Sequence, residues 1–312
     1  MHLSGLLFFP VTPFDVAGAV DLDALEGHVE RGVDAGAGAV FAACGTGEFH
    51  ALSAAEHDRV VQTTVRIVGG RVPVFAGCGG PIGHATEIAG NAERAGVDGL
   101  LVLPPYLVEA PQAGLVAYAR TVAAATTLPL VVYSRGNAIF SPDAAREVAQ
   151  IPSVIGLKDG YGDLDLLSSI RRSVSEVRGD DFMYFNGLPT AEASMIDYRA
   201  RGVELYSSAT FAFAPQIALS FLHALEAEDH DQLERLLDTF YRPFVALRDA
   251  CPGYAVALVK EGVRLAGYDV GDVRAPLVMP LPEHVARLED ITAEGLKLCA
   301  SFGDAPRAGA SA

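Results

Sequence analysis

The sequence predicts an α/β fold: a (β/α)8 TIM barrel with a C-terminal three-helix appendage. Eight short apolar runs recur in the first 228 residues of the 312-residue chain. Their starts lie about 20 to 35 residues apart, which is the length of one strand and its crossover helix. After about residue 228 the runs stop and the pattern becomes helical. Eight strand–helix units in succession indicate a closed barrel of parallel strands.

The apolar runs are typical of parallel strands that are buried on both faces. We expect strands at residues 6–10, 39–43, 72–76, 99–103, 129–133, 154–158, 182–186 and 204–207. Helix signals stand between them. Ser53 and Glu56 form a capping box, and Pro142 takes the first position of another helix. Gly69 and Gly96 stand where helices are expected to end.

The chain is expected to divide into a barrel, residues 1–228, and a helical appendage, residues 229–302. The appendage is expected to contain helices at residues 231–250, 254–266 and 282–301. Residues 303–312 combine proline, glycine and several alanines, and this composition predicts a disordered tail.

Composition limits the function classes that fit this chain. The formal net charge of −16 and a pI of about 4.8 argue against nucleic acid and anionic membranes as partners. No apolar run approaches the roughly 20 residues of a membrane helix. The four cysteines are widely spaced, and residues 6–10 are too short for the apolar part of a signal peptide. We therefore expect a cytoplasmic protein with free thiols.

Lys158 is the leading catalytic candidate because it ends a predicted buried strand. The carboxyl ends of strands are where α/β barrels place their chemistry. An ammonium group held there loses hydration, so its pKa falls, and the neutral amine can attack a ketone to form a Schiff base. The alternative is that Lys158 only extends from a strand end and pairs with Asp159.

A glycine-rich turn follows the second predicted strand. Gly45 and Gly47 flank Thr46, and this arrangement lets the backbone approach a ligand and offer N–H groups to a carboxylate. The alternative is an ordinary βα turn, which is also rich in glycine.

Further polar side chains follow the other predicted strands. Tyr133 ends the fifth strand, where its hydroxyl can move a proton, and Arg135 can bind a carboxylate. The alternative is that Tyr133 only caps the core with its hydroxyl in water. Further candidates for contact with a ligand at strand ends are Tyr106, Asn186, Ser207 and Ser208.

Two further observations concern groups that we do not place in the site. Lys260 stands in a predicted helix of the appendage and is expected to be a surface or interface lysine. The eight histidines do not cluster, and those in predicted helices are expected to be mostly exposed. No histidine–carboxylate spacing typical of zinc is present, so no metal site is predicted.

Six strings carry a resemblance to a known family. They are residues 45–49, 133–137, 156–163, 188–192, 206–209 and 253–256. Together they resemble the dihydrodipicolinate synthase / N-acetylneuraminate lyase superfamily and, within it, the branch of the 5-dehydro-4-deoxyglucarate dehydratases. The resemblance covers nearly the whole chain. Cys44 and Gly136 depart from the pattern usual in that branch.

The resemblance implies a lyase without a cofactor that forms homo-oligomers, either tetramers or dimers. Its implied substrate is a six-carbon keto-deoxy sugar diacid. Lys158 would form an iminium with the ketone, and Tyr133 would relay protons. Thr46, Gly45 and Gly47 would hold the carboxylate beside the ketone.

Two other functions remain open at this point. The same Schiff base can serve an aldolase or synthase that handles pyruvate. A barrel that binds carboxylates without catalysis is the third possibility.

Overall fold

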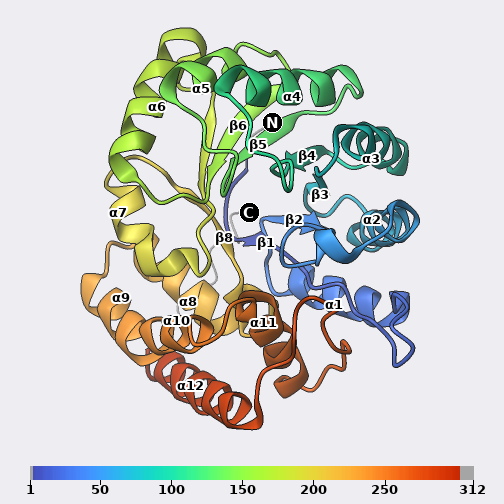
Figure 1. Cartoon of the computed structure of the whole chain (residues 1–312). Coiled ribbons are helices and arrows are strands. Elements are labelled where there is room, and N and C mark those ends of the chain that lie inside the picture. Colours follow the sequence, from blue (N-terminus) through green and yellow to red (C-terminus); the bar gives the residue numbers. More distant parts are fainter. Residues whose placement is uncertain (1–2, 303–312) are drawn as a thin grey trace, which may run out of the picture.

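The computed structural model describes residues 3–302, and its strands form a closed barrel in which neighbours in sequence pair in parallel (Figure 1). The strands are β1 (Leu7–Phe8), β2 (Ala39–Ala42), β3 (Val74–Cys78), β4 (Gly99–Val102), β5 (Leu130–Ser134), β6 (Val154–Asp159), β7 (Met183–Asn186) and β8 (Leu205–Ser208). Pairing of β1 with β8 closes the barrel. The predicted fold class is confirmed.

Each expected run overlaps one strand, although the ends differ. β1 ends two residues earlier than expected, and the whole of β3 is shifted by two residues towards the C-terminus. Pro73 lacks the N–H that a ladder requires, so it stands before the strand rather than in it. Gly77 continues β3 because the strand passes close to its neighbour there: a Cβ at this position would lie 2.4 Å from the Ala43 carbonyl oxygen.

Helices cover the outside of the barrel. They are α1 (Leu22–Asp34), α2 (Ala54–Val68), α3 (Ile82–Ala95), α4 (Gln112–Ala124), α5 (Pro142–Ala149), α6 (Leu164–Arg178), α7 (Met195–Arg199) and α8 (Pro215–Glu226). Short 3-10 turns follow three strands: η1 (Phe49–Ala51), η2 (Ala191–Ser194) and η3 (Thr210–Ala212). The capping box of Ser53 and Glu56 begins α2, and left-handed Gly69 and Gly96 end α2 and α3, as expected.

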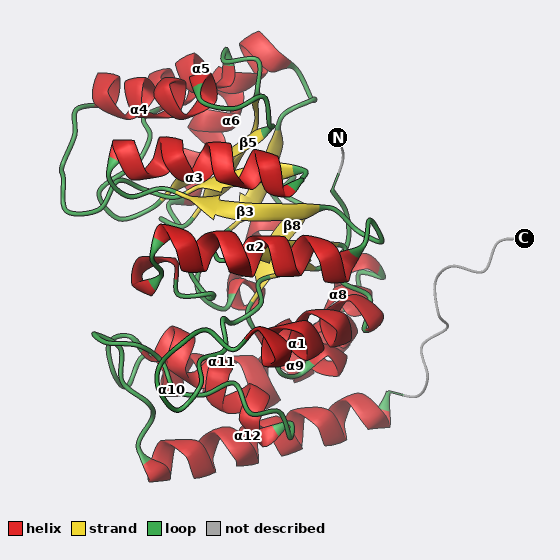
Figure 2. Ribbon diagram, turned by 90° about the vertical axis from the view of Figure 1, so that its right-hand side faces the viewer, coloured by secondary structure: helices red, strands yellow, loops and turns green. Residues whose placement is uncertain are grey.

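The remaining helices follow the barrel, and two of them, the first and the last, pack against α8. They are α9 (His230–Leu236), α10 (Arg242–Arg248), α11 (Tyr254–Leu265) and α12 (Pro282–Ser301). Figure 2 shows α12 at the outer edge of the molecule. The single helix expected at residues 231–250 is interrupted by a π-helical segment, η4 (Leu237–Tyr241). Pro243 has no N–H for the carbonyl one turn earlier, which accounts for the altered register.

Aromatic side chains pack the barrel interior next to the predicted site. Phe41 stacks on Phe9 and on Phe75, with ring centroids 4.6 and 4.8 Å apart. The four cysteines are free thiols, as expected. Between residues 3 and 302 no helix combines the length and the apolar character needed to cross a membrane. The tail predicted at residues 303–312 lies outside the described residues.

Candidate active site

Lys158 lies near the carboxyl end of β6, with its side chain directed into the barrel. The residue is 6% exposed, and its Nζ lies 4.2 Å from the centroid of the Phe9 ring and 4.5 Å from that of Tyr133. Burial lowers the pKa of the Lys158 amine from 10.5 to about 7. A large fraction of this amine is therefore unprotonated at neutral pH and able to act as a nucleophile.

Asp159 faces away from Lys158, so the alternative pairing of these two residues is wrong. Adjacent residues of a strand point to opposite faces. The Asp159 carboxylate accepts hydrogen bonds from the amides of Tyr161 and Gly162 and from the Tyr198 hydroxyl. None of these contacts, which are those of the Asp159 carboxylate with the described residues, involves Lys158. Asp159 therefore fixes the turn after β6 and leaves the amine free.

Tyr133 is the register partner of Lys158 on the neighbouring strand β5. Its hydroxyl donates a hydrogen bond to the Gly187 carbonyl (2.7 Å) and accepts one from Arg135 Nη1 (3.1 Å). Burial raises the pKa of the Tyr133 phenol, and Arg135 offsets only part of that effect. The phenol is therefore protonated and suited to donating a proton.

These side chains meet in a cavity of about 490 Å³ at the carboxyl ends of the strands. Such a volume is in the range of small-molecule sites. Seven of the predicted residues line it: Gly45, Thr46, Tyr106, Tyr133, Arg135, Lys158 and Ser207. Among these predicted residues the structure thus brings together one amine nucleophile, two phenols and one guanidinium group around a common space.

Three predicted residues do not line the cavity. The Ser208 hydroxyl is fully buried behind β8 and donates to Glu192. The Asn186 amide is likewise buried and donates to the Ala191 carbonyl, which fixes the turn after β7. Gly47 lies behind the turn that bears Thr46, where its carbonyl accepts from Thr12 Oγ1 (2.7 Å). These three residues support the walls of the cavity but do not line it, so the structure does not place them in the direct contact with a ligand that the sequence predicted.

Sequence reasoning missed the contribution of the appended helices to the cavity. Arg248 at the end of α10 lines the space and donates to the Pro189 carbonyl (2.6 Å) and to Thr190 Oγ1 (2.9 Å). Ala255 and Val256 at the start of α11 complete the wall. The string at residues 253–256 could have indicated this contribution, because it is one of the six strings that carry the family resemblance and yet it follows no predicted strand.

The predictions for Lys260 and for two histidines are wrong, since these residues are buried rather than exposed. Lys260 is fully buried and forms an ion pair with Glu48. His28 accepts a hydrogen bond from the Val11 amide, and His57 Nε2 lies 2.8 Å from the Gly77 carbonyl oxygen. Burial lowers the pKa of His28 to about 3 and that of His57 to about 4, so both rings are neutral.

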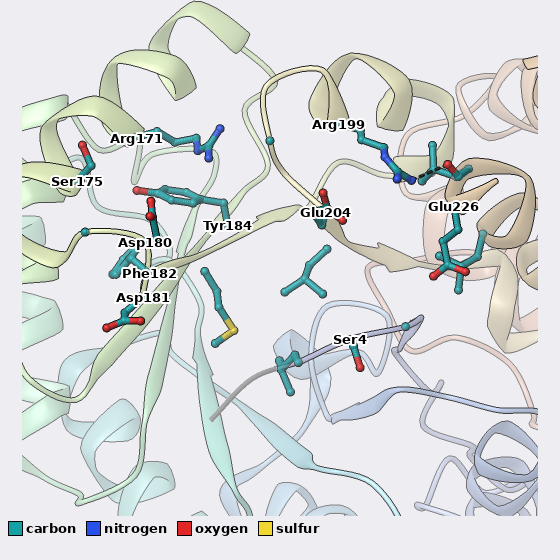
Figure 3. Close-up of a pocket in the computed structure, with 18 of the residues that line it drawn as sticks. Ser4, Arg171, Ser175, Asp180, Asp181, Phe182, Tyr184, Arg199, Glu204 and Glu226 are labelled. Atoms are coloured by element: carbon teal, nitrogen blue, oxygen red, sulfur yellow. Dashed lines mark hydrogen bonds between the residues drawn. The ribbon is translucent and has the colours of Figure 1, made fainter. Parts of the chain in front are cut away.

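A second, larger cavity of about 960 Å³ lies at the opposite end of the barrel, near the starts of β7 and β8 (Figure 3). Its charged lining mixes cations such as Arg171 and Arg199 with acids such as Asp180, Glu204 and others. Among the described residues that line it there is no buried lysine or cysteine. Because barrel chemistry is built at the carboxyl ends of strands, the smaller cavity is the candidate active site.

Comparisons with known proteins place the whole chain among its relatives. The model of the dihydrodipicolinate synthetase family matches residues 2–294. The chain is 56% identical to "Probable 5-dehydro-4-deoxyglucarate dehydratase 1" of Streptomyces coelicolor, over 94% of this chain and 93% of that protein. It is 43% identical to "5-dehydro-4-deoxyglucarate dehydratase" of Pseudomonas putida, over 91% and 93%.

Solved structures show the same architecture. Dihydrodipicolinate synthase from Oceanobacillus iheyensis superposes with a TM-score of 0.87 at 25% identity, covering 95% of this chain and 97% of that one. The enzyme of that name from Bacillus clausii gives a TM-score of 0.84 at 28% identity, covering 96% and 98%. The barrel, the match over nearly the whole length and these relatives place the chain in the dihydrodipicolinate synthetase family.

Proposed function

We propose that the chain is a lyase, a 5-dehydro-4-deoxyglucarate dehydratase. It converts 5-dehydro-4-deoxy-D-glucarate to 2,5-dioxopentanoate, CO2 and water. The observation that carries the proposal is the buried Lys158 amine, whose pKa is about 7 and which faces a cavity of suitable size. The names of relatives that are 43% to 56% identical support the choice of substrate.

The first half of the reaction forms an enamine. Lys158 Nζ attacks the ketone carbon, the carbonyl oxygen leaves as water, and an iminium remains. The iminium acidifies the adjacent CH2 because the electron pair of its C–H bond can delocalise onto nitrogen. Loss of that proton gives the enamine, with no metal or organic cofactor needed as electron sink.

The second half releases water and CO2. The enamine expels the hydroxyl group one carbon further on, which takes a proton and leaves as water, and a C=C bond conjugated with the iminium remains. The distal carboxylate is now vinylogous to the iminium, so its C–C electron pair moves into the conjugated system as CO2 departs. Protonation converts the resulting enol to an aldehyde, and hydrolysis of the imine returns the Lys158 amine.

The lining residues suggest a binding mode for the two carboxylates. Thr46 and the amides beside it would hold the carboxylate next to the ketone. Arg135, Arg248 and Ser207 would bind the distal carboxylate and hydroxyls, because they line the cavity and two of them are cationic. Tyr133 would donate the proton that the departing hydroxyl needs.

Borohydride trapping tests the Schiff base directly. The chain has three lysines, namely Lys158, the buried and ion-paired Lys260, and the exposed Lys297. Reduction in the presence of the keto-deoxy diacid should place the adduct on the peptide containing Lys158, as mass spectrometry would show, with CO2 released in the unreduced reaction. An adduct on Lys260 instead would refute the assignment.

A second candidate function is an aldolase or synthase that handles pyruvate. The superposition on proteins named dihydrodipicolinate synthase favours it over a barrel that only binds carboxylates. The same incubation separates the two enzymes, since the first releases CO2 and the second releases or consumes pyruvate. A non-catalytic barrel would leave Lys158 unlabelled.

We also propose that the chain forms homo-oligomers, as dimers or tetramers. Tyr106, Leu107 and Val108 form an exposed apolar loop after β4, and the Leu107 side chain is fully accessible to solvent. Leu107 also adopts a positive φ of 72°, which is uncommon for a leucine. A second copy covering this loop would remove apolar surface from water.

Two further proposals concern location and domain organisation. Buried free thiols at Cys44 and Cys78 are compatible with the reducing cytoplasm, where we place the protein. We propose a barrel at residues 1–228 and an appendage at residues 229–302, because α8 ends at Glu226 and no strand follows in the described chain.

A further inference from the structure

A buried ion pair lies behind the turn that bears Thr46, outside the cavity. Lys260 Nζ, from α11, is 2.8 Å from Glu48 Oε1, and neither side chain is exposed to solvent. The ammonium group also donates to the Asp272 carbonyl (2.8 Å) and lies 4.0 Å from the centroid of the Phe14 ring. Neither member of the pair lines the cavity, so the proposed chemistry uses neither of them.

Glu48 has a backbone conformation that its surroundings must hold in place. Its φ of 55° and ψ of 42° lie in the left-handed region, which a residue with a Cβ rarely adopts. The residue closes the turn after β2, where its amide donates to the Gly45 carbonyl (3.2 Å). We call residues 44–49 the carboxylate loop. The position of Thr46 within this loop therefore depends on the turn at Glu48.

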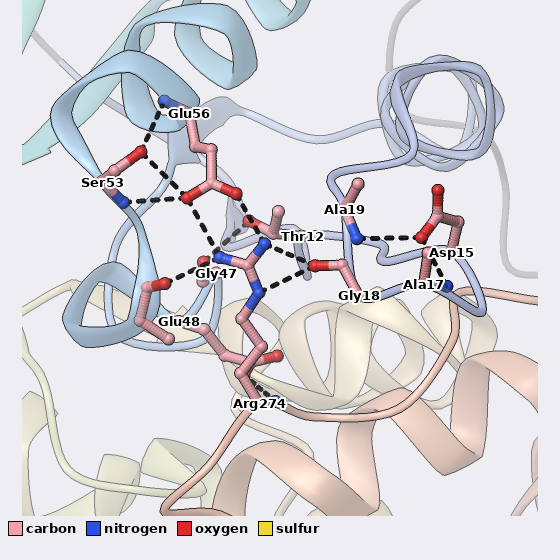
Figure 4. Close-up of polar contacts among 11 residues, drawn as sticks. Thr12, Asp15, Ala17, Gly18, Ala19, Gly47, Glu48, Ser53, Glu56 and Arg274 are labelled. Carbon is pink, nitrogen blue, oxygen red and sulfur yellow. Dashed lines mark hydrogen bonds and ion pairs between the residues drawn. The ribbon is translucent and has the colours of Figure 1, made fainter.

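Arg274 holds the same carboxylate from a third element (Figure 4). Its backbone amide donates to Glu48 Oε2 (2.8 Å). Its guanidinium group pairs with Glu56 at the start of α2 and donates to the carbonyls of Ala51 and Gly18. Each oxygen of the Glu48 carboxylate thus has its own partner, one on α11 and one on the segment before α12.

A hydrogen bond from the segment after β1 holds the other side of the loop. Thr12 Oγ1 donates to the Gly47 carbonyl (2.7 Å). Gly47 joins Glu48 to Thr46 in the chain, and Thr46 and Gly45 are the residues of the loop that line the cavity. A shift at Glu48 would therefore be transmitted to Thr46 and to the amides that face the ligand.

We propose that the Lys260–Glu48 ion pair positions the carboxylate loop for the substrate carboxylate next to the ketone. Lys260 and Glu48 are positioning residues, since they act through Thr46 and touch no reacting atom. This inference rests on the proposed function and adds a determinant of substrate affinity to it. It also explains why a lysine of the appended helix α11 is fully buried.

A double variant in which two neutral residues replace the ion pair distinguishes a positioning role from a purely stabilising one. Replacement of one partner leaves the other charge buried and unpaired, which destabilises a protein whatever the role of the pair. The Glu48→Gln/Lys260→Met double variant leaves no lone charge, and such replacements are often neutral for stability. The amide side chain that replaces the Glu48 carboxylate would have no ammonium to anchor it, so the loop should relax although the fold persists.

The test compares two small ketones as borohydride-trapping probes for Lys158. Pyruvate carries the carboxylate beside the ketone, and methyl pyruvate carries an uncharged ester in its place. In the double variant we expect the apparent dissociation constant of pyruvate to rise about 10-fold or more, as for loss of a hydrogen bond to a charged group. That of methyl pyruvate should change less than about twofold. Hydrogen exchange at the amides of residues 44–49 should quicken.

The matched control is Val263→Ala, a cavity-forming change at a fully buried position of the same helix. It should lower the melting temperature and leave the ratio of the two dissociation constants unchanged. Equal effects on both probes in the double variant, or wild-type exchange of the loop amides, would overturn the positioning role. If the wild-type enzyme gave no adduct with the diacid, the proposed function would fail, and hydrogen exchange would still decide the positioning role.

Discussion

At the scale of single residues, the buried amine of Lys158 is the feature on which the proposed chemistry depends. Its pKa falls to about 7 because burial disfavours the ammonium form, and nearby Arg135 adds to the effect. Only the neutral amine attacks the ketone. The fraction of competent enzyme should therefore rise with pH through about 7 and then become constant.

The pH dependence of borohydride labelling measures this ionisation. We expect the labelling rate of Lys158 at subsaturating diacid to rise about tenfold per pH unit well below 7 and to level off above 8. Mass spectrometry of the Lys158 peptide provides the rate, and the exposed Lys297 gives the background. A rise that continues to pH 10 would contradict a lowered pKa.

Tyr133 is predicted to act as a proton donor. Its raised pKa keeps the phenol protonated, and Arg135 directs a hydrogen bond to its oxygen. Tyr133→Phe should retain the fold and substrate binding and reduce kcat by about 10²- to 10⁴-fold, as for a lost general acid. Steady-state kinetics, with circular dichroism as the folding control, would measure this. A reduction below tenfold would leave Tyr133 with a packing role and direct attention to Tyr106.

Some of these residues could be predicted because they depend only on local pattern. An apolar run that ends in lysine places Lys158 at a strand end whatever the register of the other strands. Ser207 and Ser208 could not be separated in this way, because a shift of one residue exchanges the two faces of a strand. β8 extends one residue beyond the expected end, and Ser208 faces outward to Glu192.

At the scale of elements, the turn after β7 leaves no room for a side chain beside Lys158. A Cβ at Gly187 would lie 2.6 Å from Cγ and Cε of Lys158 and 2.9 Å from the Asp159 carbonyl oxygen. Such a contact must displace the lysine side chain or the end of β6. Gly187 also provides the carbonyl to which Tyr133 donates.

Gly187→Ala is therefore expected to reduce kcat by about 10²-fold, since a displacement near 1 Å of a reacting group has that effect. Stopped-flow or steady-state assays with the diacid would measure the change. The control is Gly83→Ala in α3, where the added Cβ meets no atom within 4 Å. That variant should keep wild-type kinetics and become slightly more stable, because alanine favours helices.

The spacing of strands and helices predicted the barrel, yet it could not show which appended element reaches the cavity. The position of the Arg248 side chain at the cavity depends on its hydrogen bonds to Pro189 and Thr190, which belong to the turn after β7. Lys260 is buried only because Glu48 lies opposite it in the fold. Tertiary contacts of this kind leave no periodic signal in the sequence.

At the scale of the whole molecule, the exposed loop after β4 makes the proposed oligomer testable. A charge at Leu107 should weaken association, because burial of an unpaired carboxylate in an apolar interface is costly. We expect Leu107→Asp to shift the sedimentation coefficient towards that of a monomer at micromolar concentration. Val16→Asp, at an equally exposed apolar position far from this loop in sequence, is the control. Sedimentation of the wild type as a monomer alone would refute the proposal.

The stability of the whole fold should depend on the ionisation of Glu192. Its carboxyl group is fully buried between β8 and η4, and burial raises its pKa to about 7, although the Ser208 hydroxyl donates to it. In the unfolded chain the pKa is about 4.5. Between these values the folded state holds a proton that the unfolded state has lost. The free energy of unfolding therefore decreases as pH rises from about 4.5 to 7.

Glu192→Gln should remove this dependence. The shift corresponds to about 3 kcal/mol, so the variant should gain stability of that order relative to wild type between pH 4.5 and pH 8. Urea unfolding at pH 4.5 and pH 8 would give the stability difference between the variant and wild type at each pH, and hence the change in that difference with pH. For the control Glu294→Gln, at an exposed carboxylate of α12, this change with pH should be near zero. If the stabilities of wild type and Glu192→Gln differed by the same amount at the two pH values, the prediction would be wrong. Glu192 would then be ionised in the folded protein, with its charge stabilised by the surrounding hydroxyl groups.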